Sequence, residues 1–313
     1  MRLRPISLSS AQLRVAAIIA AVAVTVVPAG LLAWGDAGHR ITGEAAALRL
    51  PTEMPPFFRA ASKQLAYLNP EPDRWKDKAE SSIDHALDDW AYPDHFIDMD
   101  LVDTAVLNAA LKAPHRYAYI DTITAHGAKA PIVGFLPFRI LELSQRLRVE
   151  FRMWRAAPNN TTRKWIEARI INDAGILGHY VADGSNPLHA TKQYNGWTGE
   201  NPNGYATDRR THGRFEGAYV QSNIKLADVL AKVDPQARVL PDFRSAIVSY
   251  LSRSASEVEH FYQVDKANAF DSSTTASENK AFASERLATG AQMLRDIWWT
   301  AWVTSVPAPR PSR

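Results

Sequence analysis

The stretch TTRKWIEARIINDAGILGHYVADGSNPLHA, residues 161–190, decides the fold and carries the first candidate site. Between Trp165 and Val181, apolar residues recur mostly at spacings of three and four, which is typical of one face of an α-helix. The helix is expected to end near Gly184, because the residue before Pro187 disfavours the helical region. The stretch therefore predicts a long helix that finishes in a polar segment.

Three polar side chains of this segment are candidate metal ligands. On a helix, His179 and Asp183 project from one face about one turn apart, a spacing at which two ligands can chelate a single ion. Pro187 is suited to start a new helical turn, which would bring His189 back toward the same volume. The alternative is that His179 is an ordinary core histidine.

The remaining sequence predicts an all-α protein. Helical periods recur in four further segments, residues 137–155, 211–232, 240–264 and 278–303. Alternating strand patterns of useful length are nearly absent. Residues 69–94, rich in Pro, Asp and Lys, and residues 194–210, rich in Gly, Asn and Pro, are predicted to be loops. We expect a single compact multi-helix domain over residues 34–306 and a disordered tail at 307–313.

Residues 1–33 have the composition of a secretory signal peptide. Residues 1–14 contain three arginines and no acid, and an apolar run follows over residues 15–32. The chain turns polar directly after Ala33. An uncleaved membrane anchor is the alternative, since about 18 apolar-leaning residues can just span a bilayer. Pro28 within the run, and the chemistry of a free amine at Trp34, favour cleavage. We expect a secreted or periplasmic protein.

Composition limits the possible metal ligands and partners. The excess of Lys and Arg over Asp and Glu, 36 against 33, resides in the signal segment, so the rest of the chain is balanced. It gives no long-range electrostatic argument for a polyanionic partner. The chain has no cysteine, which excludes disulfides and thiolate metal sites. His, Asp, Glu and backbone groups remain as ligands, a donor set that suits zinc.

Two further groups of candidates lie outside this stretch. His212 and Glu216 repeat the spacing of four, although a solvated helix face is the alternative because arginines surround them. His95 lies among carboxylates in PDHFIDMD, and Asp73 lies in the rigid turn NPEPDRW, where capping is the alternative role.

The predicted new N-terminus offers one more candidate. Trp34 would carry a free amine after cleavage, and His39 follows five residues later. Such an amine is a good ligand once deprotonated, and metal binding promotes that deprotonation.

Together these elements resemble the zinc-dependent superfamily that unites bacterial phospholipases C with the single-strand-specific nucleases of fungi and plants. The family pattern His-x3-Asp-x5-His, followed by His-x3-Asp/Glu, is matched by His179, Asp183, His189, His212 and Glu216. The N-terminal tryptophan and histidine and the His-Phe-Ile-Asp element are matched by Trp34, His39 and residues 95–98. The matching elements cover residues 34–220.

The resemblance implies an all-helical fold with three zinc ions at the bottom of a cleft. It implies these ligand sets: Asp73, His95, His179 and Asp183 for one ion; His189, His212 and Glu216 for another; and for the third the amine and carbonyl of Trp34 with His39, Asp183 bridging this ion to the first.

The carboxylate ligand at Asp73 is one of several acids that could take this position. Asp73 is preferred because it precedes Arg74, as the family carboxylate often precedes a basic residue. The segment between Asp73 and His95 is longer than expected for the family, and it contains other acids: Asp77, Glu80, Asp84 and Asp88.

The resemblance implies hydrolysis of phosphate esters by a metal-activated water. Asp73 is expected to orient or deprotonate that water as the catalytic residue. Asp98 is expected to accept the free ring hydrogen of His95. Aromatic side chains would bind the substrate, with Phe96, Phe135, Trp197 and Tyr205 as candidates.

Three details favour a phospholipase C-like activity. Glu216 stands where the nucleases usually carry Asp, His212 is not preceded by the Asn-Leu typical of the nucleases, and cysteine is absent. The alternative within the superfamily is a single-strand-specific endonuclease or 3'-nucleotidase, with single-stranded nucleic acid rather than phospholipid as substrate. The alternative of another class is an exported zinc-binding protein without turnover, which the long 69–94 segment would favour. We expect a monomer without an obligatory protein partner.

Overall fold

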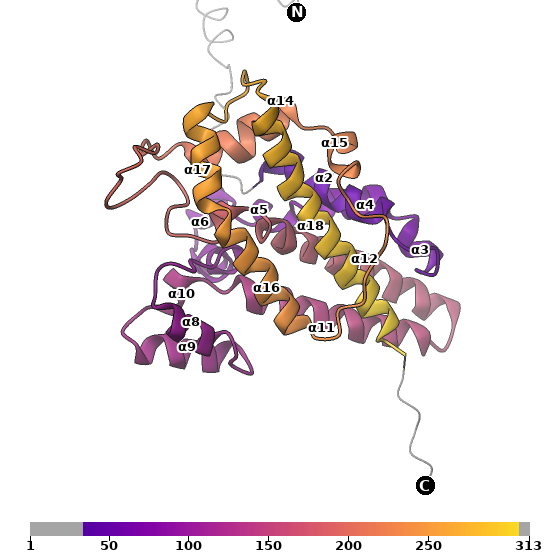
Figure 1. Ribbon diagram of the computed structural model, residues 1–313. Helices are drawn as coiled ribbons and strands as arrows, with labels where there is room; N and C mark the ends of the chain where they lie inside the picture. The colour runs from indigo at the N-terminus through magenta and orange to yellow at the C-terminus, as the bar shows by residue number, and fades with distance from the viewer. Residues whose placement is uncertain (1–33, 307–313) are drawn as a thin grey trace, which may run out of the picture. The chain divides into compact units, whose positions relative to one another are not determined.

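The computed structural model describes residues 34–306; the predicted signal peptide and tail lie outside this range. Within it the chain is helical, without strands and with one isolated bridge between Tyr194 and Gly196 (Figure 1). The prediction of a compact all-α protein is confirmed. None of the helices of the described range has the length and apolar character needed to cross a membrane.

The long helices form the framework and the short ones connect them. The long elements are α2 (Gly35–Leu48), α9 (Arg116–Ala125), α11 (Leu136–Arg155), α12 (Asn160–Asp183), α16 (Phe243–Ser256), α17 (Val258–Ala267) and α18 (Ser277–Val303). The short elements are α3 (Pro56–Arg59), α4 (Ser62–Leu68), α5 (Glu71–Arg74), α6 (Lys78–Ser81), α7 (Ala86–Ala91), η1 (Tyr92–His95), α8 (Thr104–Ala110), α10 (Ala130–Val133), η2 (Pro187–His189), α13 (Thr211–Gly213), η3 (Arg214–Tyr219), α14 (Val220–Asn223) and α15 (Leu226–Leu230).

Helix α12 is the central element, in contact with α2, α4, α11 and α18. It begins where the Asn159 side chain accepts a hydrogen bond from the amide of Thr162, a normal N-cap. Its last seven residues, 177–183, are all buried, so no side of the helix faces solvent there. A helix enclosed on all sides places its polar residues in the protein interior. The candidate ligands His179 and Asp183 are therefore interior groups.

Two glycines allow α4 to approach α12 closely. A Cβ atom on Gly175 would lie 2.3 Å from the Cβ of Leu68, and one on Gly178 would lie 2.1 Å from Nδ2 of Asn69. Both distances are far below van der Waals contact, so only glycine fits at these positions. The close approach brings the end of α4 and the turn after it against the end of α12.

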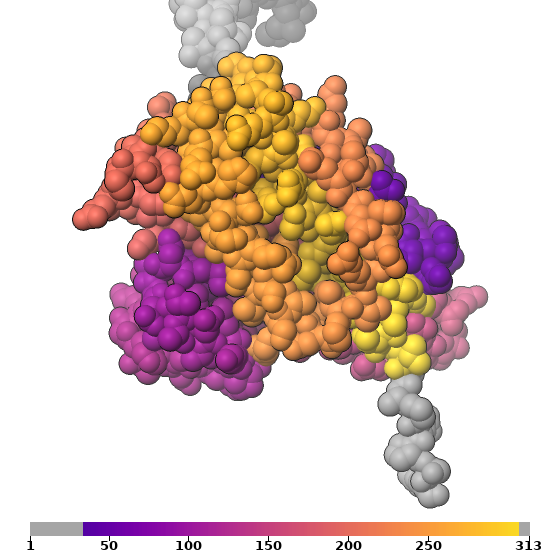
Figure 2. All heavy atoms as spheres, viewed as in Figure 1, coloured from indigo at the N-terminus to yellow at the C-terminus, as the bar shows by residue number. Residues whose placement is uncertain are grey.

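Several predicted segments differ in detail. The predicted helix at 240–264 is two helices that meet at Glu257, and the one at 211–232 is divided at Ile224, whose backbone is extended. The segment 69–94 contains α5, α6, α7 and η1 rather than irregular chain, although it is not one helix. Prolines in the first turns of α5 and η1 fix where these short helices begin. Residues 194–210 form the predicted loop, which projects on the same side of the view as the segment 86–133 (Figure 2).

Candidate metal centre

The end of α12 provides the first two candidate ligands. His179 and Asp183 are fully buried, with 3.2 Å between Nε2 and Oδ2. Nδ1 of His179 donates a hydrogen bond to the carbonyl of Asn69 at 3.0 Å. A ring nitrogen that donates in this way leaves the lone pair on Nε2, which faces Asp183. The helical spacing predicted this pair, and its geometry suits metal binding.

Two candidates from the N-terminal third complete this group. Nδ1 of His95 lies 2.9 Å from Nε2 of His179 and 3.0 Å from Oδ2 of Asp183. Asp73, buried in α5, places Oδ1 3.7 Å from Nε2 of His179 and Oδ2 3.8 Å from Nε2 of His39. The contacts of His95 link residues 84 and 88 positions apart, which only the tertiary fold brings together.

Asp73 is the acid of the 69–94 segment that enters the cluster. Asp77 instead caps α6 by accepting a hydrogen bond from the amide of Glu80. Asp84 accepts one from the amide of Ala86 in the same exposed region. Asp88 lies on the wall of a cavity described below.

The start of α2 lies against the end of α12 and against η3. Nε2 of His39 is 3.4 Å from Oδ1 of Asp183, and the ring stacks on His179 with centroids 4.0 Å apart. Trp34 is buried, donates a hydrogen bond from Nε1 to the carbonyl of Ala182 at 2.6 Å, and packs on Phe215. A ligand role for its amine depends on cleavage after Ala33, and that bond involves a residue outside the described range.

His189, His212 and Glu216 form a second group. Oε1 of Glu216 is 3.1 Å from Nε2 of His189, and Oε2 is 2.6 Å from Nε2 of His212. Nδ1 of His189 donates to the carbonyl of His95 at 2.6 Å, and Nδ2 of Asn186 donates to Oε1 of Glu216. The two groups are close, since Nε2 of His189 lies 3.9 Å from Oδ1 of Asp183.

The helix that carries the second pair is not the one predicted. His212 lies in the short α13, and Glu216 lies in η3, a π-helix over Arg214–Tyr219. A π-turn holds one more residue than an α-turn and is often found at functional sites. The predicted spacing brings the two side chains together, but a regular α-helix was the wrong expectation.

These side chains can hold metal ions in three overlapping groups. The groups are His39, His179 and Asp183; Asp73, His95 and His179; and His189, His212 and Glu216. Many of their atoms are buried without a hydrogen-bond partner among the described residues: both ring nitrogens of His39, Oδ2 of Asp73, Nε2 of His95, Oδ1 of Asp183, Nδ1 of His212 and Oε2 of Glu216. Burying unpaired polar atoms is unfavourable, and divalent cations would satisfy them. The donor set fits metal binding.

The pKa values of three candidate ligands suit metal binding, whereas burial lowers the pKa of His189 but the carboxylates of Asp183 and Glu216 outweigh it and raise this pKa to about 9. Burial and the nearby His179 lower the pKa of His39 to about 4, and burial with the nearby Lys76 lowers that of His95 to about 3. Burial opposes ionisation of Asp73, but the charges of His179 and Lys76 outweigh it and lower its pKa to about 2. Neutral imidazoles and ionised carboxylates are the forms that bind cations.

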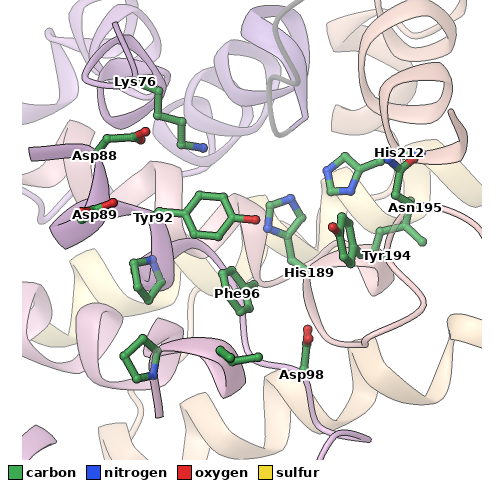
Figure 3. A pocket seen from close by; sticks show the side chains of 14 residues that line it. Lys76, Asp88, Asp89, Tyr92, Phe96, Asp98, His189, Tyr194, Asn195 and His212 are labelled. Carbon is green, nitrogen blue, oxygen red and sulfur yellow. Dashed lines mark hydrogen bonds between the residues drawn. The ribbon is translucent and has the colours of Figure 1, made fainter. Parts of the chain in front are cut away.

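A cavity of about 670 Å³ opens onto His189 and His212 (Figure 3). Its apolar wall is formed by Tyr92, Pro93, Phe96, Ile132 and Leu188, and its polar wall includes Lys76, Asp98 and Asn195. The side chain of Lys76 points into the cavity in Figure 3, and its Nζ lies 2.8 Å from Oδ1 of Asp73. The cavity therefore combines a cation, an apolar wall and two candidate metal ligands.

Sequence reasoning missed Lys76, Tyr92 and Tyr194, which all line this cavity. The spacing of three between Asp73 and Lys76 is a signal that could have indicated the lysine, since the turn that follows α5 brings the two together and the Lys76 amide donates to the Asp73 carbonyl at 3.2 Å. The two tyrosines carry no comparable signal, because most aromatic residues of a helical protein belong to its core.

One expectation about a neighbouring residue is wrong, and the four aromatic candidates lie in different places. Asp98 does not bond to His95, whose Nδ1 faces Asp183 instead; Asp98 lies on the cavity wall, where burial and Asp100 raise its pKa to about 7. Of the four aromatic candidates, Phe96 lines the cavity. Trp197 and Tyr205 pack on Tyr262, and Phe135 packs on Tyr119.

The fold and the cluster together define an all-helical protein with a buried, cysteine-free group of histidines and carboxylates able to hold metal ions. No protein-family model, curated protein or solved structure matches the chain. A functional argument for this protein therefore depends on the donor set, the cavity and its lining.

Proposed function

We propose that the protein is an exported, zinc-dependent phosphodiesterase, secreted or periplasmic and monomeric. The observation that carries the proposal is that the three possible metal-binding groups lie side by side. Two of them share His179, and the third, which opens into the cavity, lies 3.9 Å from Asp183. Several cations held close together beside a cavity select for an anionic group that can bridge them, and a phosphate ester is such a group. Nitrogen and oxygen donors without thiolates suit zinc.

The chain's own residues would bind and orient the reactants. The metal ions, when bound, would supply Lewis-acid activation of the phosphate and of the attacking water. Lys76 directs an ammonium group into the cavity and would bind a phosphoryl oxygen. The apolar wall would hold an organic substituent of the phosphate and exclude water around it.

Asp73 is proposed to orient the attacking water. Lys76 holds Oδ1, whereas the buried Oδ2 has no hydrogen-bond partner in the described range. The lowered pKa keeps this carboxylate ionised near neutral pH, so it accepts a hydrogen bond from water. The water oxygen then bonds to phosphorus as the bond to the leaving oxygen breaks; the water releases one proton to solvent and the leaving oxygen takes one proton from solvent, so the step balances.

The cavity accommodates either of two organic substituents. A diacylglycerol or a nucleobase would each fit against Tyr92 and Phe96. The absence of cysteine and the Glu216 position favour the phospholipid version, but neither feature contacts a substrate, so charges that line the site bear more directly on the choice. An exported zinc-binding protein without turnover is the proposal of another class.

The test is hydrolysis of bis(p-nitrophenyl) phosphate by the zinc-loaded protein, with a chelator-treated sample as control. We expect hydrolysis that the chelator abolishes and that zinc restores. Metal analysis of the same sample shows whether ions are bound. Bound zinc without any hydrolysis would favour the non-enzymatic protein. Parallel assays on phosphatidylcholine vesicles and on an oligonucleotide distinguish the two substrate classes.

A further inference from the structure

A second hollow, of about 310 Å³, lies beside the cavity. We call it the loop hollow, and it is lined by Lys192, Tyr194, Asn195, Gly196, Trp197, Thr198, Thr207 and Arg209. Most of these residues belong to the 194–210 loop, to which none of the candidate metal ligands belongs. Its lining contains two cations and no carboxylate.

Both cations of the loop hollow are available to an anion. Lys192 and Arg209 are exposed, and neither forms an ion pair within the described part of the chain. Two neighbouring acids are engaged elsewhere: Asp208 pairs with Arg210, and Asp100 accepts hydrogen bonds from Thr191 Oγ1 and from the Lys192 amide. A third, Asp98, is near Lys192 but lies on the wall of the first cavity. Glu200 is the other acid of the loop, and it is not part of the lining.

The loop is braced rather than loose around the hollow. Oε1 of Gln193 accepts hydrogen bonds from the amide and hydroxyl of Thr198, and the amide of Trp197 donates to the carbonyl of Ala206 at 2.7 Å. Gly196, with φ 104°, donates to the hydroxyl of Tyr262 at 3.0 Å. The hollow is thus preformed, which reduces the entropy cost when a ligand binds.

Arg209 is held in an unusual backbone conformation. Its φ is 56°, in the left-handed region that non-glycine residues seldom adopt. A Cβ on Gly196 would lie 3.3 Å from the amide of Arg209, so the two sides of the loop meet there. Backbone conformations of this kind are frequent at functional sites.

The loop hollow is continuous with the cavity through shared residues. Tyr194 and Asn195 line both. Oδ1 of Asn195 accepts a hydrogen bond at 3.2 Å from the amide of His212, a candidate metal ligand. Tyr194 is 46% exposed and presents an aromatic ring at the shared wall. A ligand that extends from the metal centre past Tyr194 would reach Lys192 and Arg209.

From this geometry we infer that Lys192 and Arg209 form a second anion subsite, which binds the next phosphate of a single-stranded nucleic acid whose reacting phosphate lies at the metal centre. The inference rests on the proposed function. A single strand carries phosphates in series and bases that stack on aromatic rings, whereas a phosphatidylcholine has one phosphate. The subsite would therefore favour oligonucleotides over isolated phosphodiesters.

The test compares single-charge variants on two substrates, bis(p-nitrophenyl) phosphate and oligothymidylate. Arg209→Gln and Lys192→Gln should each lower the ratio of kcat/KM for oligothymidylate to that for the small diester by up to about fivefold, the range of one exposed ion pair. The slope of log(kcat/KM) for the oligonucleotide against log salt should flatten by roughly 0.7 for each phosphate that the variant no longer binds. Arg210→Gln, adjacent in sequence and paired with Asp208, is the matched control and should change neither quantity.

A binding measurement makes the test independent of catalysis. Fluorescence anisotropy of a labelled oligothymidylate with chelator-treated protein should show weaker binding for the two subsite variants than for Arg210→Gln. If Arg209→Gln does not fold, Arg209→Gly removes the charge in a backbone conformation that glycine adopts freely.

The possible failures are distinguishable. Hydrolysis of neither substrate by the zinc-loaded wild type would contradict the proposed function itself. Subsite variants that behave like Arg210→Gln on both substrates would overturn the second anion subsite and leave the phosphodiesterase proposal intact. Hydrolysis of phosphatidylcholine and the small diester, but not of oligothymidylate, would likewise overturn the second anion subsite and leave the phosphodiesterase proposal intact.

Discussion

The two pairs of candidate ligands at a spacing of four, His179 with Asp183 and His212 with Glu216, are built differently. The first lies on a regular α-helix enclosed by four other helices, and both of its members are fully buried. The second begins in a single α-turn and continues into a π-helix, and the side chain of His212 is 12% exposed. Equal spacing in sequence therefore led to two local structures.

Glycines next to each pair show the same difference. Gly178, directly before His179, is packed against Asn69 and Leu294, whereas a Cβ on Gly217, directly after Glu216, would meet nothing within 4 Å. The first pair is fixed by tertiary packing. The helix of the second pair has an open side at Gly217, although its other side packs on Gly35, where a Cβ would lie 3.2 Å from the carbonyl oxygen of Glu216. Four substitutions test this comparison.

Asp183→Ala should have the largest effect. Its carboxylate lies within 4.0 Å of His39, His95, His179 and His189, so its removal should disturb both groups. We expect metal-dependent hydrolysis to fall by more than about 100-fold, beyond the loss typical for outer-shell partners of metal ligands. Metal content measured by mass spectrometry should fall with it.

Asp173→Ala is the control for this change, because Asp173 is buried on the same helix but pairs with Arg146 outside the cluster. It should retain the metal content of the wild type. Asp183→Ala protein with full metal content would show that Asp183 is not a ligand.

Glu216→Ala should have a smaller and more local effect. We expect loss of the ion held with His189 and His212, retention of metal at the His179–Asp183 group, and a fall in activity of about 10- to 100-fold. Glu216→Asp keeps the carboxylate and serves as the conservative comparison. Loss of all bound metal from Glu216→Ala would mean that the two groups form only as a unit.

Gly178→Ala tests the packing of the first pair. The added methyl group would lie 2.1 Å from Nδ2 of Asn69 and 3.0 Å from Cδ2 of Leu294. Overpacking of this kind costs about 1–3 kcal/mol of the free energy of unfolding, which urea denaturation measures. Stability equal to the wild type would show that α4 can move away from α12 at little cost.

Gly217→Ala is the matched substitution at the second pair and should have the smallest effect, of opposite sign. With nothing within 4 Å and a helical backbone, alanine should stabilise the protein by about 0.4–1 kcal/mol in the same assay. Destabilisation would indicate that the π-helix requires the conformational freedom of glycine.

The same contrast explains how much the sequence predicts. Helical spacing identified His179 with Asp183 and His212 with Glu216, and the Asn186–Pro187 break correctly returned His189 to the same volume, because these are local rules. The choice of Asp73 among the acids of the 69–94 segment depended on a resemblance, since nothing local separates it from Asp77 or Asp84. Burial by α12 separates them in the structure.

Features that depend on distant contacts were not predictable in this way. The π-helix over Arg214–Tyr219 has the same residue types as an α-helix, and its extra residue is visible only in the hydrogen-bond register. Tyr92 and Tyr194 line one cavity although they are about a hundred positions apart in the chain. Their convergence follows from the packing of α7, η1 and the 194–210 loop rather than from any periodicity.

The π-helix has a consequence for the evolution of the second metal-binding group. A π-turn contains one residue more than the α-turn it replaces, and one residue corresponds to about 100° of rotation on an α-helix. Deletion of a single codon within residues 214–219 would restore a regular helix and rotate His212 away from the elements that follow. The second metal-binding group could therefore disappear, or arise, in one genetic step while the helices around α12 stay as they are. We expect descendants of this fold that keep the His179–Asp183 group and lack the other.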